Sequence, residues 1–258
     1  PPRGELSLGD RWILSRLNDV TRRVDTALEE YRFNDAALAL YQFTWHELCD
    51  WYIEVIKPAL MVESGGETSK AVLGRVLERT LRLLHPIVPF ITEEIWQKLP
   101  GREGESIVIA PWPEPEPDWD DQAAEKDFEY LSGILGSIRN IRGELNISPK
   151  REITPTIRPG DKTEKNLIEK ELEWFLRLGN ISGDIVIGTG AEQPAASASA
   201  VFGNTASFVP IAGLIDVDEE ISRLEKQTAD IAKTIGALEK KLSNPNFIER
   251  APEEVVEK

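Results

Sequence analysis

Apolar residues recur every three or four positions through most of the first hundred residues, which is the spacing of one face of an α-helix. The first stripe predicts a helix from about Asp10 to Glu30, and Ser7 stands three residues before Asp10, as in a capping box. A second helix follows Asn34 and ends or kinks at Pro58. Its expected buried face consists of Leu38, Tyr41, Trp45, Leu48, Tyr52 and Ile56. Because the connection between the two helices is short, we expect them to pack as antiparallel neighbours.

Two more helices complete a helical bundle, which we place at residues 1–112. Gly65 and Gly66 predict a loop, and the apolar stripe from Leu73 to Leu84 predicts the third helix. The fourth helix begins at Pro89, a residue suited to the first turn of a helix.

The bundle is followed by a connector rich in proline and acidic residues at 113–120. The sequence SIVIA at 106–110, which leads to it, predicts a short extended run. Residues 113–129 carry eight acidic side chains against a single lysine. We therefore interpret this segment as a linker between two compact units.

Residues 121–213 mix helical and strand patterns. One long helix is predicted from about Asp121 to Leu145 and another from Asp161 to Gly179. The sequences EITPTIR, DIVIG and ASAVFGNTASFVPI predict short strands. Pro155 favours a sheet edge for the first of them, and Gly203-Asn204 predicts a hairpin turn in the last. The expected fold class is mainly α: a helical bundle, then a small α+β domain, then a C-terminal coiled-coil helix.

That last helix is predicted by apolar residues from Val217 to Leu242, whose spacing alternates between four and three. The sequence SNPN predicts a turn, and Pro252 predicts the start of an antiparallel partner helix that the chain cuts short. We interpret residues 214–258 as a truncated coiled-coil arm of a longer protein. Since an unpaired apolar stripe is costly in water, we expect the arm to fray, to pack on a neighbouring molecule or to self-associate.

Composition excludes several classes of protein. The net charge of −15 argues against indiscriminate binding of nucleic acid, including DNA, because Lys and Arg are what neutralise phosphates. No apolar run approaches the ~20 residues of a membrane span, and the first residues show no signal-peptide pattern, so we expect a cytoplasmic protein with no membrane partner. One cysteine and two histidines are too few for a structural zinc site, so we expect no metal.

No sequence pattern is typical of a catalytic centre. The chain has no glycine-rich phosphate loop, no serine nucleophile elbow and no cluster of metal ligands. Acidic pairs such as Glu93-Glu94 lie in first helical turns, where they complement the helix dipole. We therefore expect no catalytic residues and no cofactor in this chain.

Two candidate binding sites lie in the bundle. Trp12, Arg16 and Arg23 share a stripe on the first helix, which predicts an aromatic ring and two guanidiniums on a solvent-facing edge. Arg32 and Phe33, in the turn after this helix, offer the same chemistry. Such groups bind unpaired RNA bases by stacking and RNA phosphates through arginine. The alternative at both places is an aromatic residue at the core boundary beside solvated arginines.

A third candidate site lies in the sequence SIRNIRGELNISPKR. Arg139, Asn140 and Arg142 lie close together on the predicted long helix, and Lys150 and Arg151 follow just beyond its end. We expect these side chains to converge on one phosphate track of an RNA. The alternative is that they form salt bridges with the acidic connector.

Several segments resemble a known family. LSLGDRWILSRLNDV, YRFNDAALALYQFTWHELCDWYIEVIKPAL and LRLLHPIVPFITEEIWQKLP are similar to the helical anticodon-binding domain of class I aminoacyl-tRNA synthetases of the valine, isoleucine and leucine group. SIVIAPWPEP, IRNIRGELNISPKR, FVPIAGLIDVDEEISRLEK and KLSNPNFIERAPEEVVEK narrow the resemblance to the bacterial valyl-tRNA synthetase family. The resemblance covers almost the whole chain.

The resemblance implies the tRNA-binding C-terminal region of an enzyme that joins valine to tRNA(Val) using ATP with Mg²⁺. It also implies that the bundle meets the anticodon stem and loop. The coiled-coil arm is implied to meet the outer corner of the tRNA, where the D and T loops pack. The HIGH and KMSKS signatures of class I enzymes are absent from this sequence, so the resemblance implies a catalytic core that lies upstream.

Other functions stay open. The same region of an isoleucyl enzyme usually carries a terminal cysteine zinc site, which a single cysteine forbids, and leucyl enzymes lack this coiled-coil ending. A different class of function is a protein-interaction module built on the heptad stripe. Preferential binding of tRNA(Val) over an unrelated tRNA would separate the RNA-binding function from the interaction module.

Overall fold

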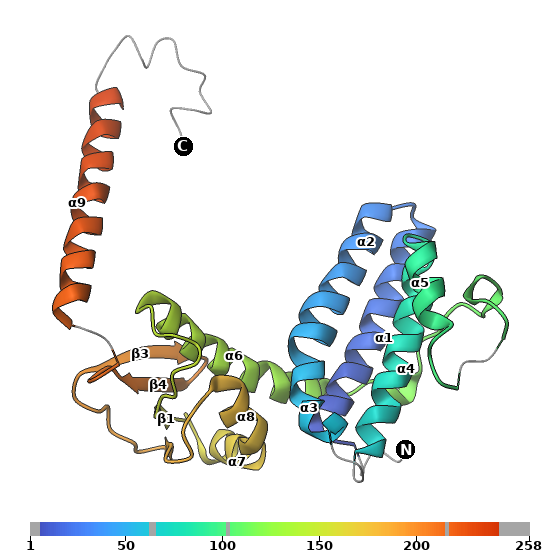
Figure 1. The fold of residues 1–258 in the computed structure, drawn as a ribbon, viewed down its shortest axis with the longest axis horizontal. Coiled ribbons are helices and arrows are strands. Elements are labelled where there is room, and N and C mark those ends of the chain that lie inside the picture. Colours follow the sequence, from blue (N-terminus) through green and yellow to red (C-terminus); the bar gives the residue numbers. More distant parts are fainter. Residues whose placement is uncertain (1–5, 62–65, 102–103, 215–216, 243–258) are drawn as a thin grey trace.

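The computed structural model of the protein describes residues 6–61, 66–101, 104–214 and 217–242. These residues form a bundle of helices, a small sheet flanked by helices, and one long projecting helix (Figure 1). The predicted fold class, mainly α with a small α+β part, is confirmed.

The bundle begins at α1 (Leu8–Glu29) with the predicted capping box. The Asp10 amide donates to the Ser7 hydroxyl at 3.1 Å, and the Ser7 amide donates to the Asp10 carboxylate at 3.1 Å. The Tyr52 hydroxyl also donates to this buried carboxylate, at 2.6 Å, which joins α1 to the next helix. The other bundle elements are α2 (Phe33–Tyr41), η2 (Gln42–Ile53), α3 (Glu54–Met61), α4 (Glu67–Leu84) and α5 (Pro89–Trp96).

The second predicted helix buries a different face from the one expected. α2, η2 and α3 continue one another, but η2 is a π-helix, whose bonds from residue i to i+5 widen the turn. The buried residues are Ala36, Ala39, Leu40, Phe43, Leu48, Tyr52 and Ile56. The prediction was wrong for Leu38, Tyr41 and Trp45, which are exposed. It was right for Leu48, Tyr52 and Ile56, which are buried. The wider turn of η2 changes which residues face the core, so the α-helical spacing that fits Leu48, Tyr52 and Ile56 does not fit the residues before them.

The connector packs on the bundle. The predicted extended run is instead a 3₁₀ turn, η3 (Ile107–Ile109), because the Ser106 side chain caps it by accepting from the Val108 amide. A second 3₁₀ turn, η4 (Pro117–Trp119), follows. Asp120, just after it, pairs with Arg22 of α1 at 2.5 Å.

A long helix, α6 (Gln122–Glu144), leads from the bundle to the sheet (Figure 1). Asp121 caps its first turn by accepting from the Ala124 amide at 3.0 Å. α6 is continuous despite its glycines, and one of them is required. A Cβ at Gly133 would lie 2.2 Å from the Phe202 ring, so only glycine lets the sheet approach the helix this closely.

The sheet has the strand order β2-β1-β4-β3. Its strands are β1 (Thr156–Arg158), β2 (Val186–Ile187), β3 (Ser197–Phe202) and β4 (Thr205–Pro210). β1 pairs with both β2 and β4, so the predicted edge position was wrong. Pro155 stands before the first residue of β1, where its missing N–H removes no ladder bond. The β3–β4 hairpin turns at Gly203-Asn204 as predicted, with Gly203 at φ +56°.

Between β1 and β2 the chain forms α7 (Lys162–Lys170) and α8 (Leu172–Gly179). The sequence predicts one helix here, and the structure breaks it at a turn around Glu171. α8 ends at Gly179, as expected, with Asn180 in the left-handed conformation at its cap.

One hydrophobic cluster runs through the bundle, α6, α8 and the sheet. At its centre the Phe128 ring of α6 stacks on Trp12 of α1, with ring centroids 3.8 Å apart, and on Trp174 of α8, at 5.6 Å. Trp51 of η2 meets the same ring edge-on at 5.9 Å. The predicted boundary at the connector therefore has buried aromatic contacts across it.

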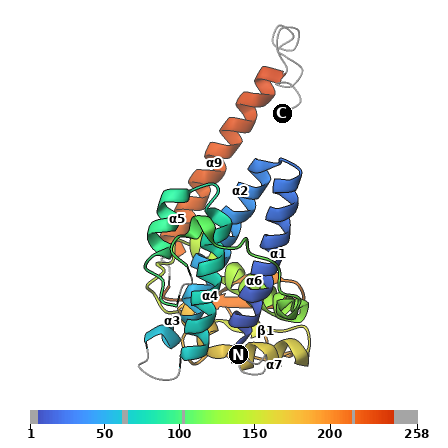
Figure 2. The same ribbon diagram turned by 90° about the vertical axis from the view of Figure 1, so that its right-hand side faces the viewer.

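The last described helix, α9 (Val217–Leu242), projects beyond the sheet in both views (Figures 1 and 2). The predicted helix is thus confirmed. The predicted turn and partner helix after it lie outside the described residues, so the pairing of this arm as a coiled coil stays a prediction.

Candidate RNA-binding surfaces

Large apolar side chains are exposed at one end of the bundle, the upper end in Figure 1, where the α1–α2 and α4–α5 turns lie. Tyr31 in the first turn and Phe33 at the start of α2 are 80% and 61% exposed, and Phe90 at the start of α5 is 91% exposed. The bundle tip, as we define it, consists of Tyr31, Arg32, Phe33, Ile87, Phe90 and Ile91. Exposed apolar groups gathered in this way mark a binding surface.

Local backbone geometry holds the tip rings outward. Tyr31 lies in the left-handed region at φ 59°, an uncommon conformation for a bulky residue. The Arg32 amide donates to the Ala27 carbonyl at 2.7 Å, which closes the turn. The Tyr31 and Phe33 rings meet edge-on, with centroids 6.3 Å apart. Two aromatic faces are thus presented together at the end of the bundle.

A groove of about 390 Å³ lies between α1 and α2 beside the tip. Arg22, Arg23 and Arg32 line it, together with Asp35, which pairs with Arg32. Arg22 pairs with Asp120 at 2.5 Å and Arg23 with Asp19 at 3.5 Å, both at exposed positions. Because exposed ion pairs contribute only about 0–1 kcal/mol, a phosphate can replace these carboxylates. The groove is suited to an anionic backbone.

The predicted edge on α1 is divided between core and surface. Trp12 is 7% exposed because α6 packs over this side of α1, so the prediction of a solvent-facing ring was wrong. The alternative, an aromatic residue at the core boundary beside solvated arginines, holds for Trp12 and Arg23 but not for Arg16, whose guanidinium is ion-paired. Arg16 lies 2.9 Å from Glu47 and 3.1 Å from Glu125, and hydrogen bonding to Glu47 raises its pKa above the ordinary value. Arg23 remains exposed.

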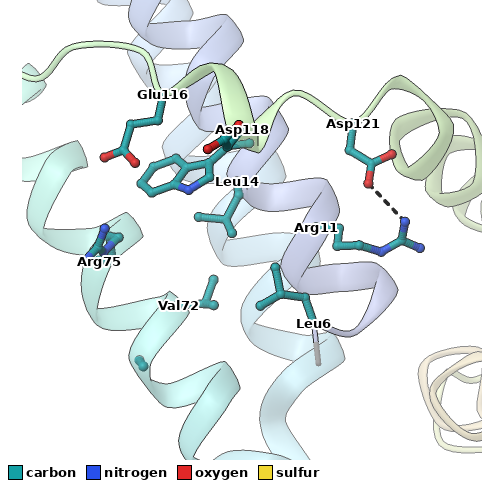
Figure 3. A pocket seen from close by; sticks show the side chains of 10 residues that line it. Leu6, Arg11, Leu14, Val72, Arg75, Glu116, Asp118 and Asp121 are labelled. Carbon is teal, nitrogen blue, oxygen red and sulfur yellow. Dashed lines mark hydrogen bonds and ion pairs between the residues drawn. The ribbon is translucent and has the colours of Figure 1, made fainter. Parts of the chain in front are cut away.

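The connector borders a groove of about 630 Å³ on the opposite side of α1, against α4. Its lining includes Leu6, Arg11, Leu14, Val72, Arg75, Glu116, Asp118 and Asp121 (Figure 3). Arg11 pairs with Asp121 at 3.0 Å, and Glu116 pairs with Arg79. Acidic groups thus balance the arginines here. They pair with α1 and α4, and not with the basic segment from Arg139 to Arg151, as the alternative had it.

Arg139 and Arg142 converge on carbonyl oxygens at the end of α8. Arg142 is 6% exposed and donates to Gly179 at 3.1 Å and to Asn180 at 2.9 Å. Arg139 donates to Leu178 at 3.2 Å. Burial lowers the pKa of both guanidiniums. Arg142 does not face solvent, because α8 returns beside α6 and its last carbonyls need donors, and contact of Arg142 with an RNA phosphate stays a prediction.

The other residues of the basic segment point in different directions. Arg151 donates to the carbonyl oxygens of Leu214, at 3.1 Å, and Gly213. Asn140 and Lys150 are exposed. RNA contact by these two residues stays a prediction.

α9 carries exposed apolar residues along its length. Ile221, Ile231, Ile235, Leu238 and Leu242 are between 44% and 61% exposed. This stripe follows the predicted heptad spacing, and it is a second surface on which the molecule can bind a partner.

The sequence does not single out several of these surface residues. Phe90 and Ile91 lie in α5, where only Thr92 and Trp96 are buried, so an apolar run reads as core although most of it is exposed. Arg22 looks like any solvated helix arginine until α2 closes the groove beside it. A short helix with more apolar residues than one face can bury is the signal that could have found the tip.

Two further observations limit the chemistry. Among the described residues, no three His, Cys, Asp or Glu side chains lie close enough together to hold a metal ion. None of the helices in the described part of the chain combines the length and the apolar character that a membrane span requires.

Comparison with known families matches both parts of the chain. Residues 10–157 match the family described as the anticodon-binding domain of tRNA ligase. Residues 216–258 match the family described as the valyl tRNA synthetase tRNA binding arm.

Similar curated proteins carry the name valine–tRNA ligase. That of Geobacter sulfurreducens is 46% identical over 259 residues, which cover 98% of this chain and 29% of the relative. Those of Syntrophotalea carbinolica and Oceanobacillus iheyensis are 43% and 41% identical, again over 98% of this chain and over 28% and 29% of the relatives. The chain thus spans less than a third of the length of these relatives.

Proposed function

Because this chain belongs to the family described as the anticodon-binding domain of tRNA ligase, and its last residues match the valyl tRNA synthetase tRNA binding arm, we propose that it is the C-terminal tRNA-binding region of a valine–tRNA ligase. Its proposed partner is tRNA(Val). The bundle tip takes unpaired bases of the anticodon loop, and the groove between α1 and α2 takes the phosphates beside them. The arm takes the outer corner of the same tRNA.

The observation that carries this proposal is the meeting of exposed rings and arginines at the tip. Stacking on an aromatic face binds a base of any sequence, and it requires the base to be unpaired. Arg32 belongs both to the tip and to the groove lined by Arg22 and Arg23. A loop of RNA offers unpaired bases beside phosphates, whereas a helical stem hides its base edges.

The overall charge supports selectivity. At −15, the chain repels nucleic acid from most of its surface. RNA is then held only where arginines and rings coincide, and wrong placements meet like charge.

The ligase reaction itself is proposed for the whole enzyme. We place ATP with Mg²⁺ and valine in the part of the ligase outside the matched region, because this sequence contains neither the HIGH nor the KMSKS signature. The residues of this chain then bind and orient the tRNA. As a component of protein synthesis, the enzyme is placed in the cytoplasm.

The test is a fluorescence anisotropy titration of the chain with labelled tRNA(Val), with a tRNA for an unrelated amino acid, and with the isolated anticodon hairpin of tRNA(Val). We expect tRNA(Val) to bind at least about tenfold more tightly than the unrelated tRNA, a difference of about 1.4 kcal/mol. The hairpin should compete with the tRNA. Equal affinity for both tRNAs at the same salt concentration would contradict the proposal.

A second candidate function is favoured by the exposed stripe of α9. Apolar residues in heptad spacing bind another helix, so the arm can act as a protein-interaction module. Sedimentation analysis without RNA separates the two functions. Self-association combined with no tRNA binding would support the interaction module.

A further inference from the structure

Arginine side chains donate to backbone carbonyls at each junction between the bundle and α9. We name these residues the arginine clamps; they are Arg177, Arg139, Arg142, Arg151 and Arg223. Each of them donates at least one hydrogen bond to a backbone carbonyl of a different segment of the chain. Carbonyls at helix ends lack an intrahelical partner and carry the negative end of the helix dipole, so a guanidinium is well suited to them.

The first clamp joins the bundle to α8. Pro58 lies inside α3 and has no N–H, so it leaves the carbonyl of Glu54 without its helical donor. Arg177 of α8 donates to this carbonyl at 2.6 Å and to that of Val55 at 3.0 Å. Pro58 frees a carbonyl and Arg177 binds it, so the two residues together form one contact between the bundle and α8.

The next two clamps close the C-terminal end of α8 against α6. Arg142 donates to the carbonyls of Gly179 and Asn180. It also donates to the backbone carbonyls of Arg151, at 2.7 Å, and Ser148, at 3.2 Å. Arg139 holds Leu178 and places its guanidinium 4.9 Å from the centre of the Trp51 ring of the bundle. Bundle, α6, α8 and the loop after α6 are therefore fixed together.

The last two clamps act where α9 leaves the sheet. Arg151 donates to the carbonyls of Gly213 and Leu214, just before the arm. Arg223, in the second turn of α9, donates to the carbonyl of Glu144 at 3.1 Å. Glu144 is the last residue of α6, so α9 is held to the same helix that leads back to the bundle.

We propose that the arginine clamps are positioning residues, which hold α9 at a fixed direction from the bundle so that one folded RNA contacts the tip and the arm together. The inference rests on the proposed function for its RNA partner. It gives the arginines of the basic segment an indirect role in RNA binding, through the backbone and not through phosphates.

The physical advantage is effective concentration. Once the tip holds an RNA, a rigid junction keeps the arm near its own contact, and the second contact costs less entropy. A junction that rotates freely loses this gain even though every contact residue is unchanged. Arginine suits the task because its planar fork reaches two acceptors, whereas lysine is a point donor.

The test uses Arg151→Ala combined with Arg223→Ala, both at accessible positions near α9. The matched control is Lys162→Ala combined with Lys170→Ala, which removes the same two positive charges from exposed positions on α7 and breaks no described side-chain bond. Arg151→Lys is the second variant: it keeps the charge and weakens the two-carbonyl contact.

The first measurement is structural and needs no RNA. Cys49, the only cysteine of the chain, is exposed on η2 and takes one spin label, and Lys233→Cys on α9 takes the other. We expect a narrow distance distribution for the parent and for the Lys162→Ala, Lys170→Ala control. The double variant should give a broadened or shifted distribution, and Arg151→Lys a smaller change. Distributions that match the parent in both clamp variants would overturn the proposal.

The second measurement compares a tRNA(Val) transcript with its isolated anticodon hairpin, which cannot reach the arm. The double variant should bind the full tRNA at least about tenfold more weakly and the hairpin with unchanged affinity, because only the two-point contact is lost. An equal loss of affinity for both RNAs would indicate a misfolded chain. In that case Arg151→Lys decides, through the ratio of its affinity loss for the full tRNA to its affinity loss for the hairpin. If the parent binds neither RNA, the proposed function fails, while the distance measurement still decides whether the clamps orient α9.

Discussion

At the scale of single residues, the environment of an arginine decides whether it binds RNA or holds the fold. Arg142 and Arg23 both lie in long helices beside the apolar residues of a stripe. Arg142 is buried among carbonyls, whereas Arg23 lines an open groove. The donor groups are identical, so the difference lies in what packs beside them. Burial without a carboxylate partner makes Arg142 an expensive residue to lose.

Replacing Arg142 by alanine should therefore destabilise the chain. The substitution leaves carbonyls at the end of α8 without their donor, at a cost of about 2–4 kcal/mol in the free energy of unfolding. Urea unfolding measures this change, provided the slope with denaturant stays constant. Lys150→Ala is the control and should change stability by less than about 0.5 kcal/mol. Equal values for the two variants would show that the carbonyl contacts contribute nothing.

Phe33→Ala should weaken RNA binding and leave stability unchanged. The ring is exposed in the free protein, so its removal costs no core packing, whereas loss of one stacked base costs about 1–3 kcal/mol of binding. Titration with the anticodon hairpin measures the effect, and Phe33→Trp should restore it. Trp45, a similarly exposed ring further along the same continuous helix, provides the control variant Trp45→Ala. If both alanine variants bind the hairpin equally, the tip is not the stacking site.

At the scale of elements, features set by neighbouring residues could be predicted and features set by distant ones could not. The capping box of Ser7, the hairpin at Gly203-Asn204 and the heptad of α9 are local patterns, and the structure contains each of them. The burial of Trp12 depends on α6, more than a hundred residues away. The change of buried face in η2 could not be predicted either, because the sequence was interpreted with the α-helical period and a π-helix has a different one.

The candidate site shows the same division. Arg32 and Phe33 could be found because a turn between two helices is exposed wherever the helices pack. Phe90 could not, since the apolar run before Trp96 gives no sign of which residues the bundle leaves uncovered. The direction of the Arg139 and Arg142 guanidiniums of α6 depends on the position of α8, which only the fold supplies.

The arm itself makes a prediction about elements. Its stripe is exposed, so two molecules can bury it by pairing their arms. Ile235→Gln combined with Leu238→Gln should reduce self-association in sedimentation experiments over a range of protein concentrations. Lys233→Gln, a polar change on the same helix, should leave association unchanged. Association that persists in the double variant would arise from another surface.

At the scale of the whole molecule, an acidic protein that binds RNA must do so with few phosphate contacts. The net charge is −15, and the basic groups near the tip are those of Arg22, Arg23 and Arg32. Each phosphate contact to unpaired RNA contributes about −0.7 to the slope of log affinity against log salt, so the anticodon hairpin should show a shallow slope of about −2. A highly basic RNA-binding protein would give a steeper one.

Replacing Arg22 and Arg23 together by alanine should flatten this slope by about 1.4, because two counterion-releasing contacts are lost. Affinity should fall most at low salt, where the carboxylates of Asp120 and Asp19, each with one arginine partner fewer, repel the RNA over the longest distance. Titration of the hairpin at several salt concentrations measures both effects. Arg75→Ala, on the connector side of α4, removes one charge away from the tip and should leave the slope unchanged. A slope that is the same in the double variant and the parent would mean that the RNA phosphates do not enter the groove between α1 and α2.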